Sequence, residues 1–294
     1  MIPATFEYAR AATLEEALER LAADGGATRP IAGGQSLLPL MKLRLAQPER
    51  LLDIGRLVEL RGIRALPDGR VAVGALTTWT ELLADPTVMR YGLLADVLPR
   101  IADLQVRNRG TIGGSLAHAD PASDIAAPVL ALEAEIVARS IRGERVIPAT
   151  SFFVGPFETA LQPDELIVEL RLPAGRPGYG SAYRSIDQPA SGYPIAGVAV
   201  VLGRDDADAG TDAGATASGP WSYVAVAVTG VGEQPYRASA LEAALRAGAS
   251  PTDAAAHATD GIRVASDLHA DATYRAAMAR VMTRRAIETA ISRA

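Results

Sequence analysis

The sequence of 294 residues contains no cysteine and one lysine, Lys42. Without cysteine there are no disulfides, thiolate zinc sites or protein-held iron–sulfur clusters. A phosphate loop ending in Gly-Lys-Ser or Gly-Lys-Thr is excluded as well, because Met41 precedes that lysine. The three histidines form no HExxH motif, and no serine stands in a Gly-x-Ser-x-Gly elbow. P-loop, metalloprotease and serine-hydrolase chemistry therefore lose their support.

The sequence also lacks a large excess of acidic or basic residues, and it lacks long apolar runs. The net charge is −5 with acids and bases interspersed, so no basic face is available to neutralise nucleic-acid phosphates. Aromatic residues make up 5% and hydrophobic residues 49%, as in a globular protein rich in Ala, Val and Leu. No apolar run reaches the roughly 18 residues of a membrane span, and the N-terminal segment carries acids where a signal peptide needs an apolar core. We expect a cytoplasmic protein with no transmembrane segment and no nucleic-acid partner.

Capping and periodicity predict a small β-α-β unit over about residues 1–55. Thr13 precedes a helix as its N-cap, with Glu16 three residues further on. The apolar positions of that helix share one face: Leu14, Ala17, Leu18 and Leu21. The stretches "RPIAGG" and "LLDIG" are typical of short buried strands, with a helix over about residues 36–43 between them.

A second unit is predicted over about residues 56–175. It contains a helix capped by Thr78 and Glu81, the helix "PASDIAAPVLAL", and the strands "EIVARS", "ERVIPA" and "DELIVELRLP". The stretch "AGRPG" is a plausible linker to the remainder, residues 176–294. That remainder combines three Ala/Val-rich strands, a polar stretch predicted as a solvated hairpin loop (residues 204–220), and amphipathic helices. On the C-terminal helix the expected buried side is Tyr274, Met278, Val281, Met282 and Ile287.

Two glycine pairs raise the question of a ligand. One stands in "IAGGQS", and the other in "RNRGTIGGSLAHADPASD", which shows no strand or helix pattern. A glycine pair exposes consecutive backbone N–H groups without Cβ obstruction, and such groups bind phosphate oxygens when they curve inward or open a helix. Neither pair matches G-x-G-x-x-G, so a Rossmann site is unsupported. Two loops facing one another suit a pyrophosphate, although each pair alone also fits a tight turn.

Four stretches together resemble a known family: "IAGGQSLLPLMKLRLAQPERLLDI", "VGALTT", "VRNRGTIGGSLAHADPASDIAAPVLAL" and "GPFETALQPDELIVELRLP". They are similar to the FAD-binding medium subunit of molybdenum hydroxylases, the group of carbon monoxide, xanthine, nicotine and quinoline dehydrogenases. The resemblance is near-continuous to about residue 200 and weaker beyond. It implies an α+β fold: an FAD-binding domain of the vanillyl-alcohol-oxidase (PCMH) type over residues 1–175, with subdomains of about 1–55 and 56–175. A C-terminal flavoprotein domain of a three-stranded antiparallel sheet plus a helix bundle follows over residues 176–294.

The resemblance also implies which residues contact FAD. Its two pyrophosphate loops correspond to Ala32, Gly33, Gly34, Gln35, Ser36 and Leu37, and to Thr111, Ile112, Gly113, Gly114 and Ser115. The further positions that it assigns to the cofactor are His118 and Asp120 lining it, Asp124 near the adenosine half, Ile167 and Arg184 beside the flavin ring, and Tyr193 over the isoalloxazine. Many relatives carry an acid before that tyrosine, where this sequence has Gly192. No catalytic side chain and no metal ligand are expected in this chain.

The implied function is electron transfer within an oxidoreductase complex. A large molybdopterin subunit oxidises the substrate, a small subunit with two [2Fe-2S] clusters relays the electrons, and this chain passes them through FAD to an external acceptor. The assembly implied is a dimer of heterotrimers. FAD is expected to be non-covalent, because there is no cysteine and no histidine suitably placed to anchor the ring. The substrate and the final acceptor are not evident from this chain.

Two alternatives stay open at the level of sequence. A stand-alone FAD-dependent oxidoreductase would have its own substrate and would oxidise it without partners. A non-catalytic nucleotide-binding or assembly module would purify without flavin absorption.

Overall fold

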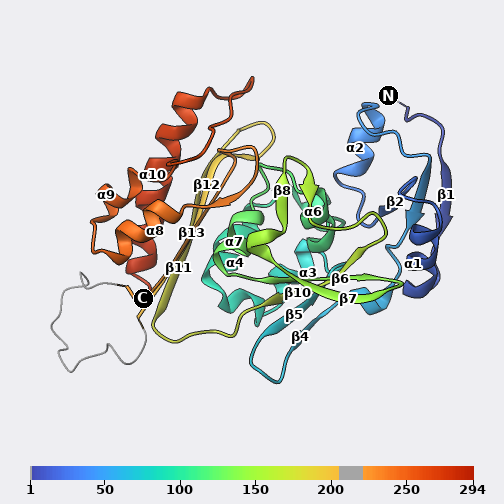
Figure 1. Ribbon diagram of the computed structural model, residues 1–294, viewed down its shortest axis with the longest axis horizontal. Helices are drawn as coiled ribbons and strands as arrows, with labels where there is room; N and C mark the ends of the chain where they lie inside the picture. Colours follow the sequence, from blue (N-terminus) through green and yellow to red (C-terminus); the bar gives the residue numbers. More distant parts are fainter. Residues whose placement is uncertain (1, 205–220) are drawn as a thin grey trace.

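The computed structural model describes residues 2–204 and 221–294 and shows three packed units in chain order (Figure 1). The N-terminal unit (blue) and the C-terminal unit (yellow to red) lie at opposite ends of the molecule, and the second unit lies between them. Most of the predicted polar loop, residues 205–220, lies outside the described residues. No helix in the described ranges has both the length and the apolar composition that a bilayer crossing requires.

The N-terminal unit is a three-stranded parallel sheet in the order β1-β3-β2. Its elements are β1 (Glu7–Arg10), α1 (Leu14–Ala23), β2 (Thr28–Ile31), α2 (Leu37–Lys42) and β3 (Arg50–Asp53). The cap of α1 forms as predicted, with Thr13 Oγ1 accepting from the Glu16 N–H at 3.2 Å. The Glu16 carboxylate in turn accepts from the Ala12 N–H at 2.7 Å. All four apolar positions predicted for the inner face of α1 are buried.

The second unit is built on a five-stranded antiparallel sheet in the order β4-β5-β10-β6-β7. Its strands are β4 (Ile63–Ala65), β5 (Val71–Gly74), β6 (Glu135–Ser140), β7 (Gly143–Pro148) and β10 (Leu166–Leu172), beside a small pair, β8 (Phe153–Gly155) and β9 (Glu158–Thr159). The helices are α3 (Trp79–Ala84), α4 (Gly92–Val97), α5 (Leu104–Arg107), α6 (Ile112–His118) and α7 (Ala126–Ala131), with 3-10 turns η1 (Val58–Leu60), η2 (Val88–Arg90), η3 (Leu98–Arg100) and η4 (Ala149–Ser151). The predicted capping box of α3 is complete, since Thr78 and Glu81 each accept a backbone N–H of the other.

One local expectation is wrong in this unit. The second glycine stretch does contain a helix, α6, whose N-cap Thr111 accepts from the Gly114 N–H at 3.2 Å. Two glycines in the first turn lower helix propensity, which hides this helix from a reading of the sequence. Tertiary contacts stabilise the helix instead, because the Gly113 N–H donates to the Ala75 carbonyl at 2.9 Å.

The C-terminal unit is an antiparallel sheet covered by helices. Its elements are β11 (Tyr179–Asp187), β12 (Pro194–Gly203), β13 (Tyr223–Thr229), β14 (Tyr236–Arg237), α8 (Ser239–Arg246), α9 (Pro251–Ala255) and α10 (Ala272–Ile291). The three long strands agree with the prediction, and the two-residue β14 extends the sheet. Helices α4 and α7 of the second unit cover one face of this sheet, and α8 and α10 cover the other. Burial on both faces explains why the strands read as continuous Ala/Val runs.

The buried side of α10 differs from the prediction. Tyr274 is 43% exposed, and its neighbour Arg275 is buried instead. The Arg275 guanidinium donates to the Ile195 carbonyl at 2.9 Å and pairs with the Asp267 carboxylate at 2.6 Å. The spacing of apolar residues cannot predict a buried arginine of this kind, because arginine counts as polar in such a pattern.

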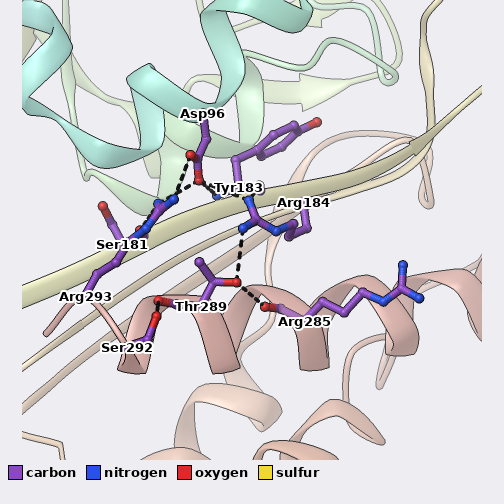
Figure 2. Close-up of polar contacts among 8 residues, drawn as sticks. All are labelled: Asp96, Ser181, Tyr183, Arg184, Arg285, Thr289, Ser292 and Arg293. Atoms are coloured by element: carbon purple, nitrogen blue, oxygen red, sulfur yellow. Dashed lines mark hydrogen bonds and ion pairs between the residues drawn. The ribbon is translucent and has the colours of Figure 1, made fainter.

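One carboxylate, Asp96 on α4, ties the second unit to the C-terminal unit (Figure 2). It accepts from the Arg293 guanidinium at 2.8 and 3.0 Å and from the Tyr183 backbone N–H at 3.0 Å. The Arg184 guanidinium donates to Asp96 at 3.3 Å and to Thr289 Oγ1 at 3.1 Å. Strand β11 of the C-terminal unit is therefore fixed, at Tyr183 and Arg184, to helix α4 of the second unit.

Candidate cofactor site

The two glycine loops, far apart in the sequence, meet in the structure. A Cβ built on Gly33 would lie 1.9 Å from the carbonyl oxygen of Arg109, so only glycine permits this approach. The Cβ position of Gly114 lies 3.9 Å from the Ala32 Cβ. The loops therefore form two sides of a single site.

The first loop presents unused backbone donors. The N–H groups of residues 33–36 donate to no protein atom within the described part of the chain. The turn is held by Gly34, whose φ is 74°, and by the Gln35 side chain, which donates to the Gly33 carbonyl at 3.1 Å. Adjacent free N–H groups at a cavity wall are the arrangement that binds phosphate oxygens.

The second loop differs from the expected pair of facing N–H nests. The N–H groups of residues 112–115 are already bonded, to Thr77, Ala75 and Thr111. Gly113 is packed, since its Cβ would lie 2.5 Å from the Ala75 Cβ. At Gly114 the nearest atom to a Cβ is the side-chain oxygen of Thr111, at 2.8 Å. This loop therefore offers the Ser115 hydroxyl and a surface without Cβ atoms, rather than a second set of free N–H groups.

Both loops line a cavity of about 980 Å³, at the upper end of the usual range for ligand sites. Most of the residues assigned to the cofactor from the sequence lie in its wall: Ala32, Gly33, Gly34, Gln35, Ser36, Leu37, Thr111, Gly113, Gly114, Ser115, His118, Asp124, Ile167 and Tyr193. They come from all three units. The cavity therefore exists only when the units are packed together.

Three assigned residues do not line this cavity. Ile112 is 2% exposed and packs in the core of the second unit. Asp120 accepts from the Ala122 N–H at 2.9 Å and lies 4.0 Å from His118 Nε2. Arg184 extends to Asp96 and Thr289, as Figure 2 shows. Its neighbour Tyr183 packs in the core of the second unit, and successive residues of a strand point to opposite faces.

Other parts of the cavity wall were not anticipated from the sequence. They include residues 25–29, which lead into the start of β2, and residues between 157 and 166, which include β9 and the turn into β10. A signal was available for the first segment, because Gly25-Gly26 is a third glycine pair, with φ of 62° and 101°. The Cβ position of Gly26 lies 3.6 Å from the Pro163 Cβ, so the two segments touch. No signal in the sequence links them.

Asp124 is the most perturbed acid of the site. Its side chain is buried at the cavity wall, and Oδ1 accepts from the Tyr183 hydroxyl at 2.7 Å. Burial raises the pKa of Asp124 to about 7, against the lowering effect of the Tyr183 hydrogen bond. Burial and the adjacent Asp124 also raise the pKa of the Tyr183 phenol well above its ordinary value. Below about pH 7 the Asp124 carboxyl is therefore mostly protonated, and the Tyr183 phenol keeps its proton throughout.

His118 and Tyr193 both stand near Asp120. Burial lowers the pKa of His118, whose ring lies 5.2 Å from that of Phe157. His118, assigned to the cofactor from the sequence, therefore lies on the cavity wall as a neutral imidazole near pH 7. Burial, with Asp120 and Asp124 nearby, raises the pKa of Tyr193. Tyr193 is 44% exposed, so its ring has a free face for stacking.

Comparison with known families covers both parts of the chain. Residues 4–175 match the family described as the FAD binding domain in molybdopterin dehydrogenase. Residues 181–290 match the family described as the CO dehydrogenase flavoprotein C-terminal domain.

Individual relatives are similar to this chain over nearly its full length. The carbon monoxide dehydrogenase medium chain of Hydrogenophaga pseudoflava is 40% identical over 298 residues, covering 100% of this chain and 99% of the relative. The 6-hydroxypseudooxynicotine dehydrogenase complex subunit alpha of Paenarthrobacter nicotinovorans is 36% identical, with 100% and 97% covered. Among solved structures, carbon monoxide dehydrogenase from H. pseudoflava superposes with a TM-score of 0.91 at 41% identity, covering 100% of this chain and 99% of that chain. Quinoline 2-oxidoreductase from Pseudomonas putida 86 gives 0.87 at 32%, with 99% of both chains covered.

Proposed function

Since the chain belongs to the family of FAD-binding medium subunits of molybdenum hydroxylases, we propose that it relays electrons through one non-covalent FAD. The electrons come from the iron–sulfur clusters of a partner subunit and leave to an external acceptor. When bound, FAD supplies the electron chemistry itself, and the protein supplies binding, orientation and electrostatics. We expect no side chain of this protein to act as an acid or base on an organic substrate.

The observation that carries the proposal is the meeting of the two glycine loops at one cavity. The free N–H groups of residues 33–36 bind pyrophosphate oxygens without a lysine. Gly114 and Ser115 complete that binding from the other side, one by leaving room and the other through its hydroxyl. A cavity of about 980 Å³ with this polar edge fits a dinucleotide.

The ring end of the cofactor is assigned to the wall near Tyr193. The tyrosine stacks on the flavin with its exposed face, and Ile167, 6% exposed on β10, supplies an apolar contact. Asp124 is close enough to Tyr193 to raise its pKa, which favours the ring end rather than the adenosine half for this acid. His118 on the wall makes non-covalent attachment a point for direct test.

The partners proposed are a large subunit with the molybdopterin cofactor and a small subunit with two [2Fe-2S] clusters, as a dimer of heterotrimers. The [2Fe-2S] clusters need another chain, because such clusters are held by cysteine thiolates and the sequence has no cysteine. Within this chain we propose that residues 1–175 form the FAD-binding domain, and residues 176–294 close the cavity from the other side. The cytoplasmic location stays a prediction.

Purification and rapid kinetics test the proposal. The chain is expected to purify yellow with about one FAD per chain, released from the denatured protein by acid, as non-covalent binding requires. In anaerobic stopped-flow, the isolated chain should not bleach with N-heterocycles, aldehydes or carbon monoxide. Rapid bleaching should need the molybdenum and iron–sulfur subunits. Flavin that stays with the denatured chain contradicts non-covalent binding, and equally fast bleaching of the isolated chain establishes the stand-alone oxidoreductase instead.

A further inference from the structure

Three polar side chains follow one another at every second position of β11: Tyr183, Ser185 and Asp187. Alternate residues of a strand project from the same face of a sheet, so the three form a row. Tyr183 belongs to the core of the second unit, whereas its neighbour Ala182 packs under the C-terminal helices. The row therefore runs along the seam between the second and C-terminal units.

The two ends of the row differ in their access to water. At the inner end the Tyr183 hydroxyl donates to Asp124, whose carboxyl lies in the cavity wall. At the outer end Asp187 Oδ2 accepts from Arg100 at 2.5 Å. The side chains of Asp187 and Arg100 are 29% and 42% exposed. The row thus runs from the cavity wall to side chains that reach solvent.

The middle of the row contains buried oxygen atoms with unused hydrogen-bonding capacity. Ser185 Oγ and Asp187 Oδ1 are buried and have no hydrogen-bond partner within the described part of the chain. Buried polar atoms of folded proteins are almost always satisfied, and a water molecule is the usual partner where the protein supplies none. Two such oxygens next to each other on one strand face mark a position where water bonds.

The surroundings of Asp124, its burial above all, favour a proton on its carboxyl. Burial and the negative field of Asp187 raise the pKa of Asp124, while the Tyr183 hydroxyl and Arg100 oppose the rise. Tyr193 faces the same acid from the loop after β11. A hydroxyl between two oxygens can accept a proton on a lone pair while it releases its own. Tyr183 can therefore pass a proton without becoming a phenolate.

We propose that Asp124, Tyr183, Ser185 and Asp187 form a proton path from solvent to the cofactor cavity. The inference rests on the proposed function, because the acceptor is bound FAD, which takes up protons with the two electrons that the iron–sulfur partner supplies. Asp124 breaks its O–H bond to release a proton into the cavity, and Tyr183 returns a proton to Asp124. Tyr183 is reprotonated from the Ser185 side, and solvent at Asp187 supplies the proton, so the protein gains no net charge.

Infrared spectroscopy of the full chain tests this path without any redox reaction. The chain, with and without FAD, is mixed at pH 6 into deuterated water. The shift of the protonated Asp124 carboxyl band is then followed with time. Asp124→Asn identifies the band. Ser185→Ala is the decisive variant, because it removes the hydroxyl that stands beside the Tyr183 phenol and between it and Asp187. Asp187→Asn tests the outer end, and Asp164→Asn, whose carboxylate pairs with Arg142 away from the row, is the control.

Exchange at Asp124 in the FAD-loaded chain is expected to slow at least tenfold in Ser185→Ala and Asp187→Asn, and to stay unchanged in the control. Unchanged exchange in both variants would show that protons reach Asp124 through the cavity mouth and would overturn the path. A spectrum at pH 6 with no band that disappears in Asp124→Asn would overturn it too, since the acid would then be ionised. Failure of the chain to bind FAD would instead count against the proposed function, and the FAD-free measurement would still decide the path.

Discussion

Replacing Asp124 by Asn should remove part of the pH dependence of the unfolding free energy of the FAD-free protein. Asn keeps an oxygen that accepts from the Tyr183 hydroxyl, so the bond of 2.7 Å survives while the titrating group is lost. Burial raises the pKa of Asp124 from 3.8 to about 7 on folding. Between these values the folded protein binds a proton that the unfolded chain has released, so wild-type stability falls as pH rises.

The size of the effect follows from the shift. Each pKa unit is worth about 1.4 kcal/mol, so the full difference is about 4 kcal/mol, of which about 2.5 kcal/mol falls between pH 5 and pH 8. Asn does not titrate and escapes this loss. Relative to wild type, Asp124→Asn should therefore gain about 2.5 kcal/mol of unfolding free energy between pH 5 and pH 8.

Urea unfolding at a series of pH values measures this difference, because the pH dependence of all other groups cancels between the two proteins. Asp164→Asn is a control of opposite sign. The Arg142 guanidinium lowers the pKa of Asp164, so that carboxylate stabilises the fold above its unfolded pKa, and its loss should be felt at high pH. If the difference between wild type and Asp124→Asn does not change with pH, Asp124 is ionised in the folded protein and the reasoning about its burial fails.

Three further substitutions test the site and the seam. Gly114→Val should weaken FAD binding at least tenfold, because the valine side chain enters the space next to the first loop. Fluorescence titration of FAD measures the affinity, and Gly175→Val, at a glycine in open surroundings, is the control. An equal loss of thermal stability in the FAD-free protein would make Gly114 merely structural. Gly33→Ala should lower the free energy of unfolding by about 1 to 3 kcal/mol and should also lower FAD affinity, because the alanine Cβ forces the two loops apart. An unchanged urea midpoint would refute the close approach of Gly33 to the Arg109 carbonyl. Arg293→Ala should cost about 1 kcal/mol by calorimetry, because Asp96 keeps its other donors; no loss would show that this ion pair does not stabilise the seam.

Features that depend on near neighbours in the chain could be predicted from the sequence. The caps at Thr13 and Thr78 and the inner face of α1 involve residues within a few positions of one another, and all were predicted. The first glycine loop belongs to this class as well, since its turn needs only Gly34 at positive φ. Local chemistry determines such elements whatever the rest of the chain does.

Only the packed structure decided how distant segments share the site. Asp124 is buried because β11 lays Tyr183 over it, 59 positions away, and that burial gives the carboxyl its raised pKa. Arg184 leaves the cavity because Asp96 and α10 hold its guanidinium on the opposite face of the strand. Arg275, and not Tyr274, lies on the buried face of α10, because its guanidinium reaches carbonyl groups at the ends of the strands. Burial and long-range hydrogen bonds depend on which surfaces meet, and the order of residues along one segment carries no record of that meeting.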